Sequence, residues 1–347
     1  MSDENNVINE EQNELYEHYS FMVDKGQSSV RIDRYVTDKI EGASRNRIQN
    51  AADSGCILVN GASKKCNYKI KPLDKISIVM PYERRGVEII PENIPLDILY
   101  EDDDLLVINK ASGMVVHPGH GNYSGTLVNA LAGYLHDNEN VNLEDERAGL
   151  LVHRIDKDTS GVIVVAKKLD ALKDLAQQFF NHTVQRRYFA LVWGRFENGE
   201  GTITGNIARS TSDRLRFKVY ADEATGKHAV THYKIVEDLG YVSLIECKLE
   251  TGRTHQIRVH LSHIGHPLFN DGRYGGDKIL YGTTFTKYKQ FITNCFSLVP
   301  HHALHAAMLG FVHPATKKEM QFEVPMPANM QMLIDKWRKY ISNRETE

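Results

Sequence analysis

LLVHRIDKDTSG, residues 150–161, runs directly into the apolar sequence VIVV at 162–165. Within six residues it places a histidine, an arginine and two aspartates, and it then ends in Thr-Ser-Gly. One interpretation is a polar turn between strands, with Asp158 or Thr159 capping the backbone. The other is a reactive loop held at the edge of a rigid sheet, where functional side chains often lie. The rest of the chain decides between them.

The length and composition indicate a globular protein with a large core. With 347 residues, 41% of them hydrophobic, the chain is expected to hold two domains. No stretch approaches the ~20 consecutive apolar residues that span a membrane. Residues 1–20 lack the basic and apolar regions of a signal peptide. The four cysteines form no Cys-x-x-Cys pair, as is typical of a reducing compartment. We therefore expect a cytoplasmic location.

Charge is distributed unevenly along the chain. The formal net charge is −3, yet residues 1–24 contain seven acidic residues and no lysine or arginine, so the remainder carries a net charge of +4. Residues 27–81 hold ten basic and five acidic side chains. Acidic polar segments tend to remain unfolded, so we predict a disordered leader over residues 1–26. The mildly basic remainder permits an RNA partner without requiring one.

Residues 27–81 are predicted to form a small domain of two helices and a hairpin. Apolar residues recur at helical spacing in SVRIDRYVTDKI (29–40). A second helix is expected in SRNRIQNAADSG (44–55), between a serine and a glycine cap. The following Asn60-Gly61 pair predicts a hairpin, which leads into a closing strand.

The basic side chains of this small domain form a predicted RNA-binding surface. The helices contribute Arg45 and Arg47, and the hairpin contributes Lys64 and Lys65. A solvated charged face is the alternative interpretation. The helix–helix–hairpin order resembles the alpha-L RNA-binding module of a small-subunit ribosomal protein and of several RNA-modifying enzymes, and this resemblance favours RNA binding.

The second half of the chain is predicted to be an α+β domain. Residues 82–100 contain prolines and mixed charge and are interpreted as a linker into a domain at 101–340. Strand patterns recur in DLLVINK (104–110), GVIVVAKK (161–168), RRYFALVWG (186–194), HAVTHYKIV (228–236) and YVSLIECKLE (241–250). Helical patterns are fewer and do not alternate regularly with the strands, which favours α+β over a doubly wound α/β fold. Neither Gly-x-Gly-x-x-Gly nor a P-loop is present, so no nucleotide cofactor is expected.

The segment LETGRTHQIRVHLSHIGHPLFNDGRYG (249–275) is predicted to contain a short helix. Thr254 is the expected N-cap, and Gly265 is the expected residue after the C-cap. On a helical wheel Arg258 lies at the border of the apolar stripe, where a guanidinium can be partly desolvated. Such an arginine needs an anionic partner, and the pair is stronger there than in water.

The histidines of this segment do not predict a metal site. His260 and His263 can share a helical face, but His255 lies about 140° around the wheel and His266 lies beyond the helix. No His-Glu-x-x-His sequence or cysteine pair supplies further ligands. We therefore expect structural or RNA-facing histidines and no metal.

Several segments together resemble the RluA-type RNA pseudouridine synthases, and within them the D group that modifies large-subunit ribosomal RNA. The resemblance is carried by HRIDKDTSG, RRYFALVWG and TGRTHQIRVHL…GHPLFNDGRYG, with flanking matches in NKASGMVVHPG and LHAAMLGFVHP. Two positions depart from the family pattern. Ala111 stands where proline is common, and His301 stands where a basic residue such as arginine is usual.

The resemblance implies a fold, a reaction and a set of site residues. The fold is a mixed, mainly antiparallel curved sheet with flanking helices. The reaction breaks the N1–C1′ bond of a uridine and rejoins the uracil through C5, without metal or redox cofactor. The implied catalytic residues are Asp156, Tyr188 and Arg258, with Arg258 keeping Asp156 ionised. The implied RNA contacts are Arg154, which fills the space of the extruded base, and the flanking His153 and His255.

Other functions remain open at this point. Whether Asp156 attacks C1′, adds to the uracil ring or removes the C2′ proton is not fixed by the sequence. Asp156 and Asp158 could serve as paired carboxylates of a glycosidase, although Arg258 argues against the raised pKa of a general acid. A substrate in transfer RNA and a non-catalytic ribosome assembly factor are the further alternatives. The expected partner is a stem-loop of large-subunit ribosomal RNA, bound by a monomer.

Overall fold

The chain divides into two compact units, Met1–Glu88 and Ile89–Glu347. A computed structural model describes residues 16–40, 45–80, 89–119, 122–135, 151–213, 216–222 and 225–345. The boundary between the units falls within the range interpreted as a linker, of which residues 82–88 lie outside the described residues. No helix in the described ranges is long and apolar enough to cross a membrane.

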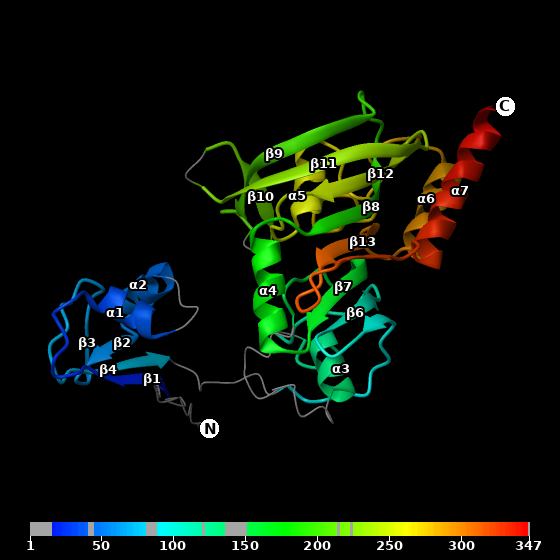
Figure 1. The fold of residues 1–347 in the computed structure, drawn as a ribbon. Coiled ribbons are helices and arrows are strands. Elements are labelled where there is room, and N and C mark those ends of the chain that lie inside the picture. The colour runs from blue at the N-terminus through cyan, green and yellow to red at the C-terminus, as the bar shows by residue number, and fades with distance from the viewer. Residues whose placement is uncertain are drawn as a thin grey trace, which may run out of the picture. The chain divides into compact units, whose positions relative to one another are not determined.

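The N-terminal unit packs two helices on a small antiparallel sheet (Figure 1). The helices are α1 (Ile32–Lys39) and α2 (Arg45–Asp53), and the strands, in the order β1-β4-β2-β3, are β1 (Tyr16–Met22), β4 (Lys75–Met80), β2 (Ile57–Val59) and β3 (Ala62–Ser63). The predicted hairpin turn is present, with Asn60 at φ 51° and Gly61 at φ 83°. These left-handed angles are those that Asn-Gly adopts readily in a two-residue turn.

Strand β1 corrects the prediction of a disordered leader over residues 1–26. Residues 16–22 pair antiparallel with β4, and Val23 after them is fully buried. Tyr19 and Phe21 pack against the core of this unit. Side chains two residues apart lie on the same face of a strand, so these two aromatic residues give β1 an apolar face. The prediction of disorder rested on the acidic composition and did not take this pattern into account. Residues 1–15 lie outside the described residues.

The C-terminal unit is built on one large sheet of ten strands in the described residues. Its order is β10-β9-β11-β12-β8-β13-β7-β6-β5, with β14 paired to β13. The strands are β5 (Ile98–Glu101), β6 (Leu105–Lys110), β7 (Ser160–Ala166), β8 (Gln185–Trp193), β9 (Glu200–Arg209), β10 (Phe217–Tyr220), β11 (Lys227–Asp238), β12 (Val242–Leu249), β13 (Leu304–Val312) and β14 (Glu319–Glu323). Only the β13–β7 pairing is parallel among these strands, so the predicted mixed, mainly antiparallel sheet is confirmed.

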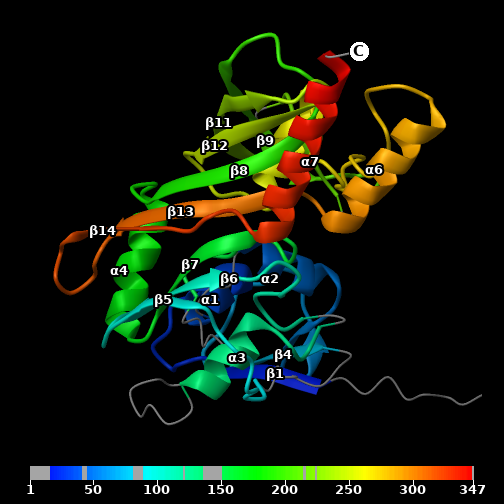
Figure 2. The same cartoon turned by 90° about the vertical axis from the view of Figure 1, so that its right-hand side faces the viewer.

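Five helices of the described residues accompany this sheet (Figures 1 and 2). They are α3 (Leu127–Tyr134), α4 (Leu169–Phe180), α5 (Gln256–His263), α6 (Thr286–Leu298) and α7 (Ala328–Glu345). Helices α6 and α7 lie side by side and bury their apolar faces with Trp193 and Trp337 in one cluster. Strand β5 begins at Ile98, inside the range 82–100 that was predicted as linker. The sheet of the larger unit therefore begins before residue 101, which corrects the predicted start of this domain.

Strand β7 positions the polar segment that precedes it. Every residue from Ser160 to Ala166 is buried, because neighbouring strands flank it on both edges and clusters of apolar side chains cover both faces. At its start, Gly161 has φ 119°, and a Cβ there would lie 2.1 Å from the carbonyl oxygen of Ala306. This close approach brings the segment before β7 next to the start of β13.

Candidate active site

The segment before β7 forms a loop that is tied to the sheet by its own backbone. Leu151 makes an isolated bridge to Val165, and the Thr159 amide donates to the Asp156 carbonyl at 3.1 Å. The buried ammonium of Lys110 donates to the Lys157 carbonyl at 2.9 Å. The loop therefore has a fixed path, which favours the reactive-loop interpretation over a solvated turn.

His153 belongs to the support of this loop and not to the cleft. Its Nε2 accepts a hydrogen bond from the Val164 amide at 3.0 Å, and its ring stacks on Phe179 at 4.5 Å between centroids. Burial lowers the pKa of His153 to about 3, and the nearby charge of Arg186 adds to that effect, so the ring is neutral and can accept. The predicted RNA contact of His153 is thereby replaced by a structural contact.

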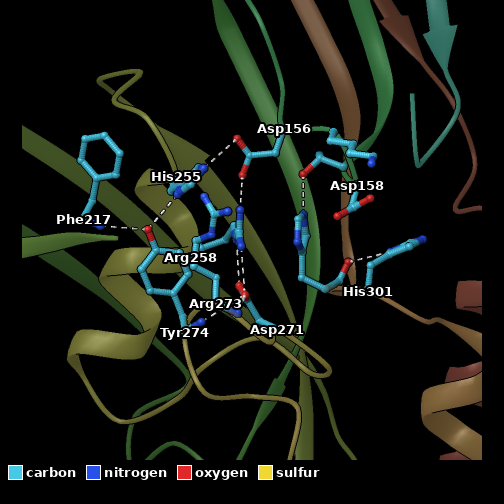
Figure 3. Close-up of polar contacts among 12 residues, drawn as sticks. Asp156, Asp158, Phe217, His255, Arg258, Asp271, Arg273, Tyr274 and His301 are labelled. Carbon is cyan, nitrogen blue, oxygen red and sulfur yellow. Dashed lines mark hydrogen bonds and ion pairs between the residues drawn. The ribbon is translucent and has the colours of Figure 1, made fainter. Parts of the chain in front are cut away.

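Arg258 joins two carboxylates at the centre of the site (Figure 3). One terminal nitrogen donates to Asp156 Oδ2 at 2.7 Å. Nε and the other terminal nitrogen donate to the two oxygens of Asp271 at 2.7 and 2.9 Å, which is a bidentate pair. The Asp271 side chain is only 1% exposed and that of Arg258 only 8%, whereas Asp156 is 20% exposed. Asp271 thus fixes the buried side of the guanidinium, and Asp156, bonded to its other side, is partly exposed to solvent.

Helix α5 supplies Arg258, but it does not begin as predicted. The N-cap is His255, at φ 56° and ψ 22°, and not Thr254. The left-handed angle turns the His255 side chain toward the site, where Nδ1 hydrogen bonds with the Tyr274 hydroxyl at 2.8 Å and Nε2 lies 3.9 Å from Asp156 Oδ1 (Figure 3). Gly265 ends the helix at φ 86°, as expected of a residue after the C-cap.

The electrostatics of the site favour an ionised Asp156. Burial would raise the pKa of this carboxyl, but charge on His255 and Arg258 and the hydrogen bond from Arg258 outweigh burial, so its pKa lies below the ordinary value. Burial lowers the pKa of His255 itself to about 4, which leaves the imidazole neutral at neutral pH. The cation acting on Asp156 is then Arg258, whose own pKa burial would lower but the bonds and charge of Asp271 and Asp156 raise.

Asp156 lies between a cleft and a narrower pocket. The cleft has a volume of about 580 Å³. Its lining is polar and consists of Arg154, Asp156, Lys157, Asp158, His255, Arg258, Asn270, Asp271, Gly272, Arg273, Asp277, Pro300, His301 and His302. The narrower pocket, of about 60 Å³, shares Arg154, Asp156 and Arg258 with the cleft and adds Tyr188 and Arg253.

The sequence-predicted residues Arg154 and Tyr188 both reach this region. Arg154 is exposed at the border of cleft and pocket. Tyr188 lies on β8 and is 9% exposed. Burial raises the pKa of its phenol, and the charge of Asp156 adds to this, so Tyr188 is protonated at neutral pH. The structure thus gathers Arg154, Asp156, Tyr188, His255 and Arg258 in one place.

Two further residues of the site, Asp271 and His302, were not singled out from the sequence. Asp271 orients Arg258, and it also accepts hydrogen bonds from the amides of Arg273 and Tyr274. His302 is 4% exposed and hydrogen bonds with the Thr159 hydroxyl at 3.0 Å, which links the residues just before β13 to the loop. His301, which stands where a basic residue such as arginine is usual in the family, hydrogen bonds with Ser112 at 2.9 Å.

The predicted RNA-binding residues of the N-terminal unit have different surroundings. Arg45 donates through Nε to Asp33 at 3.1 Å and remains 55% exposed. Lys64 lies 5.7 Å from the ring centroid of Tyr68, and Lys65 is exposed. The backbone of Arg47 belongs to α2, whereas its side chain lies outside the described residues.

The histidines of the α5 segment have separate partners. His260 hydrogen bonds with Thr231, and His266 hydrogen bonds with the Trp193 carbonyl. In the described ranges one group of three possible ligands does come together elsewhere, namely Asp102, Asp104 and His313. Two backbone amides donate to His313 Nδ1, so its Nε2 carries the proton and donates to Asp102. Both ring nitrogens of His313 are therefore used in hydrogen bonds within the protein.

Comparison with known proteins places this site in context. Residues 104–263 match the family described as RNA pseudouridylate synthase. The chain is 46% identical over 318 residues to an uncharacterised RNA pseudouridine synthase of Chlorobaculum parvum, covering 91% of this chain and 96% of that protein. It is 43% identical over 325 residues to the ribosomal large subunit pseudouridine synthase D of Zymomonas mobilis subsp. mobilis, covering 90% of this chain and 95% of that protein.

A solved structure shares the fold over most of the chain. Human RNA pseudouridylate synthase domain containing 4 has a TM-score of 0.52 to this chain and 24% identity. The similarity covers 70% of this chain and 92% of the human chain.

Proposed function

Because the chain belongs to the RNA pseudouridylate synthase family, we propose that it converts uridine to pseudouridine in large-subunit ribosomal RNA. The family assignment confirms the resemblance drawn from the motifs. The ribosomal substrate is supported by relatives named ribosomal large subunit pseudouridine synthase D, which are 43%, 38% and 40% identical to this chain. Neither transfer RNA nor a non-catalytic role is favoured by these names.

One observation carries the proposal for the site, namely the contact between Arg258 and Asp156. The reaction cleaves and re-forms a bond at C1′ of the ribose, and it needs an ionised carboxylate at the junction of sugar and base. In a dry cleft a carboxylate tends to take up a proton. The Arg258 guanidinium, 2.7 Å from Asp156, opposes this, and Asp271 holds the guanidinium in position. We assign Asp156 and Arg258 as catalytic residues.

Two other side chains are assigned to the uridine itself. Tyr188 lines the narrow pocket beside Asp156, and we assign its ring to stacking on the base and its hydroxyl to the C5 edge, where a proton is lost at the end of the reaction. Arg154 is exposed at the mouth, and we assign it to the space that the base leaves when it is extruded from the RNA helix, a step that costs a few kcal/mol. His255 contacts the same nucleotide from the side of α5.

The N-terminal unit is assigned to RNA binding outside the cleft. Arg45, Arg47, Lys64 and Lys65 are its proposed phosphate contacts, and a stem-loop is the proposed form of the RNA. We further propose that the protein acts as a monomer in the cytoplasm. The isomerisation moves no electrons and adds no water, so it calls for neither a redox cofactor nor a metal.

The test is to incubate the full chain with transcripts of large-subunit ribosomal RNA and of transfer RNA that carry labelled uridine. The proposal predicts labelled pseudouridine from the ribosomal transcript. Free uracil would instead identify a hydrolase, and unchanged uridine would identify a non-catalytic factor. Pseudouridine on the transfer RNA transcript alone would contradict the ribosomal substrate. Mapping pseudouridine in ribosomal RNA from cells with and without the protein then identifies the positions.

A further inference from the structure

A second cationic group lies near the site without a carboxylate to balance it. Arg186, on β8, is half-buried, and its buried Nε has no hydrogen-bond partner among the described residues. One of its terminal nitrogens donates to the carbonyls of Leu249 and Glu250 at 3.4 and 3.3 Å, which are long bonds. Burial lowers the pKa of Arg186, as expected of a cation that is desolvated without an anion beside it.

Neighbouring residues contact the Arg186 guanidinium and leave space for it. It lies 5.9 Å from the ring centroid of Phe179, at the end of α4. A Cβ on Gly252 would lie 2.7 Å from its Nη1, so glycine at that position leaves room for the guanidinium. Gly252 is not among the glycines with positive φ, and turn geometry therefore does not explain it. A half-buried cation of this kind carries a desolvation cost that an anionic ligand would offset.

Arg186 lines a groove of about 710 Å³ that adjoins the Asp156 pocket. Leu249 and Arg253 line both the groove and that pocket. The acidic member of the groove lining, Glu250, is bonded to His232 at 2.6 Å. The Nε of Arg253 donates to the His228 carbonyl at 2.9 Å. Two guanidiniums thus lie in one groove beside the site.

We propose that this groove binds a backbone phosphate of the RNA next to the target uridine, with Arg186 and Arg253 as the ligands of that phosphate. This inference rests on the proposed function, because the RNA strand leaving an extruded uridine must continue past the edge of its pocket. Arg253 lies at that edge. A planar guanidinium matches two phosphate oxygens, and a phosphate supplies the negative charge that Arg186 lacks in the free protein.

The first test compares Arg186→Gln with a matched control, Arg187→Gln. Arg187 follows on the same strand and points to the other face, where Glu323 pairs with it and Glu246 lies 4.0 Å from its Nε. We expect Arg186→Gln to weaken binding of the substrate RNA about tenfold. It should also reduce the slope of log affinity against log salt by about 0.7–0.9. Arg187→Gln should leave both values unchanged, and equal effects of the two variants would overturn the proposal.

The second test locates the phosphate and does not depend on how well the variant folds. In wild-type protein, each phosphate around the target uridine is replaced in turn by a neutral methylphosphonate. We expect one adjacent position to weaken binding about tenfold, and the same replacement to cost clearly less in Arg186→Gln or, if that variant does not fold, in Arg253→Gln, because one of the two guanidiniums is already missing. A scan with no sensitive adjacent position, or with additive effects, would overturn the proposal. Pseudouridine formation by wild-type protein, scored on the unmodified RNA, tests the proposed function separately.

Discussion

Arg258 uses three N–H groups on two carboxylates before any RNA is bound. The bidentate pair with Asp271 fixes the plane of the guanidinium. The remaining terminal nitrogen therefore already points at Asp156, and the Arg258 side chain does not have to change rotamer. Such preorganisation matters because the group has to act in a site from which RNA excludes water. We therefore propose three separate roles: Asp156 as the reacting carboxylate, Arg258 as the cation beside it, and Asp271 as the carboxylate that orients the cation.

Asp156→Asn removes the charge of the reacting group while preserving most of its shape. We expect pseudouridine formation to be abolished and RNA affinity to stay within a few fold of wild type, since the phosphate contacts remain. Single-turnover assays and binding titrations on the same RNA measure the two quantities. Near-normal turnover by this variant would show that Asp156 is not the reacting residue.

Asp271→Asn keeps a side chain of the same size but weakens the bidentate pair. We expect the single-turnover rate to fall about 100-fold, because a small displacement of a catalytic group has that effect, while RNA affinity changes little. Asp277→Asn is the matched control, because Asp277 lines the same cleft without contributing to the Arg258 pair. If both variants retain wild-type rates, Asp271 does not position Arg258.

The sequence could predict the Arg258–Asp156 pair but not its support. The motifs implied both partners, and the helical wheel placed Arg258 at the edge of the core. Asp271 precedes a glycine, and an Asp-Gly pair is ordinarily interpreted as a turn. Its role depends on a contact between a loop and the helix before it, which no local pattern specifies. His153 was misassigned for a related reason, because only the tertiary structure shows its bond to Val164.

At the scale of elements, the parallel pairing of β7 with β13 holds the reactive loop beside the histidines of the cleft. The backbones approach so closely that Gly161 has no room for a side chain against Ala306. Gly161→Ala also has an unfavourable φ of 119°. Together these effects should lower the free energy of unfolding by about 3 kcal/mol.

Thermal or denaturant unfolding of Gly161→Ala checks this value. Gly199→Ala is the control, because a Cβ there meets nothing within 4 Å and φ is not positive. We expect its stability to remain within about 0.5 kcal/mol of wild type. Equal stability of the two variants would mean that the β7–β13 approach is not tightly packed.

The elements that could be predicted are those with strong local patterns. All five predicted strands of the larger unit are present, because each is rich in apolar, β-branched or aromatic residues. Strand β9 contains glycines and threonines, and helices α6 and α7 mix aromatic and charged residues. The apolar residues of these three elements therefore do not recur at a regular strand or helix spacing, and the elements were not predicted. The start of α5 was misplaced because a left-handed histidine is not encoded by any capping preference.

Across the whole chain, a catalytic unit is combined with a small unit in which the excess of basic residues is confined to residues 27–81. In that segment the buried Asp33 accepts hydrogen bonds from Arg31 and Arg45, which remain 44% and 55% exposed. Burial would raise the pKa of Asp33, but the bonds from Arg31, Gln49 and Arg45 lower it well below its ordinary value. Asp33 therefore stays ionised and holds both arginines in place, where they can contact phosphates.

Deleting residues 1–88 should weaken RNA binding and flatten its dependence on salt, because fewer phosphate contacts release fewer counterions. The remaining unit has its own core and keeps the residues of the site, so single-turnover isomerisation at saturating RNA should persist. Binding titrations over a range of salt concentrations measure the slope. An unchanged slope would show that the N-terminal unit does not hold the RNA.

The electrostatic claim is tested most directly by the pH dependence of single-turnover isomerisation in wild type and Arg258→Gln. The carboxylate is active when ionised, so the rate is constant above its pKa and falls as the pH drops through it. In wild type that fall should begin below the ordinary pKa of an aspartate, near 3.8. Without the guanidinium, burial dominates and raises the pKa of Asp156, so the residual activity of Arg258→Gln should fall at a higher pH. The same acid limb in both proteins would contradict the account.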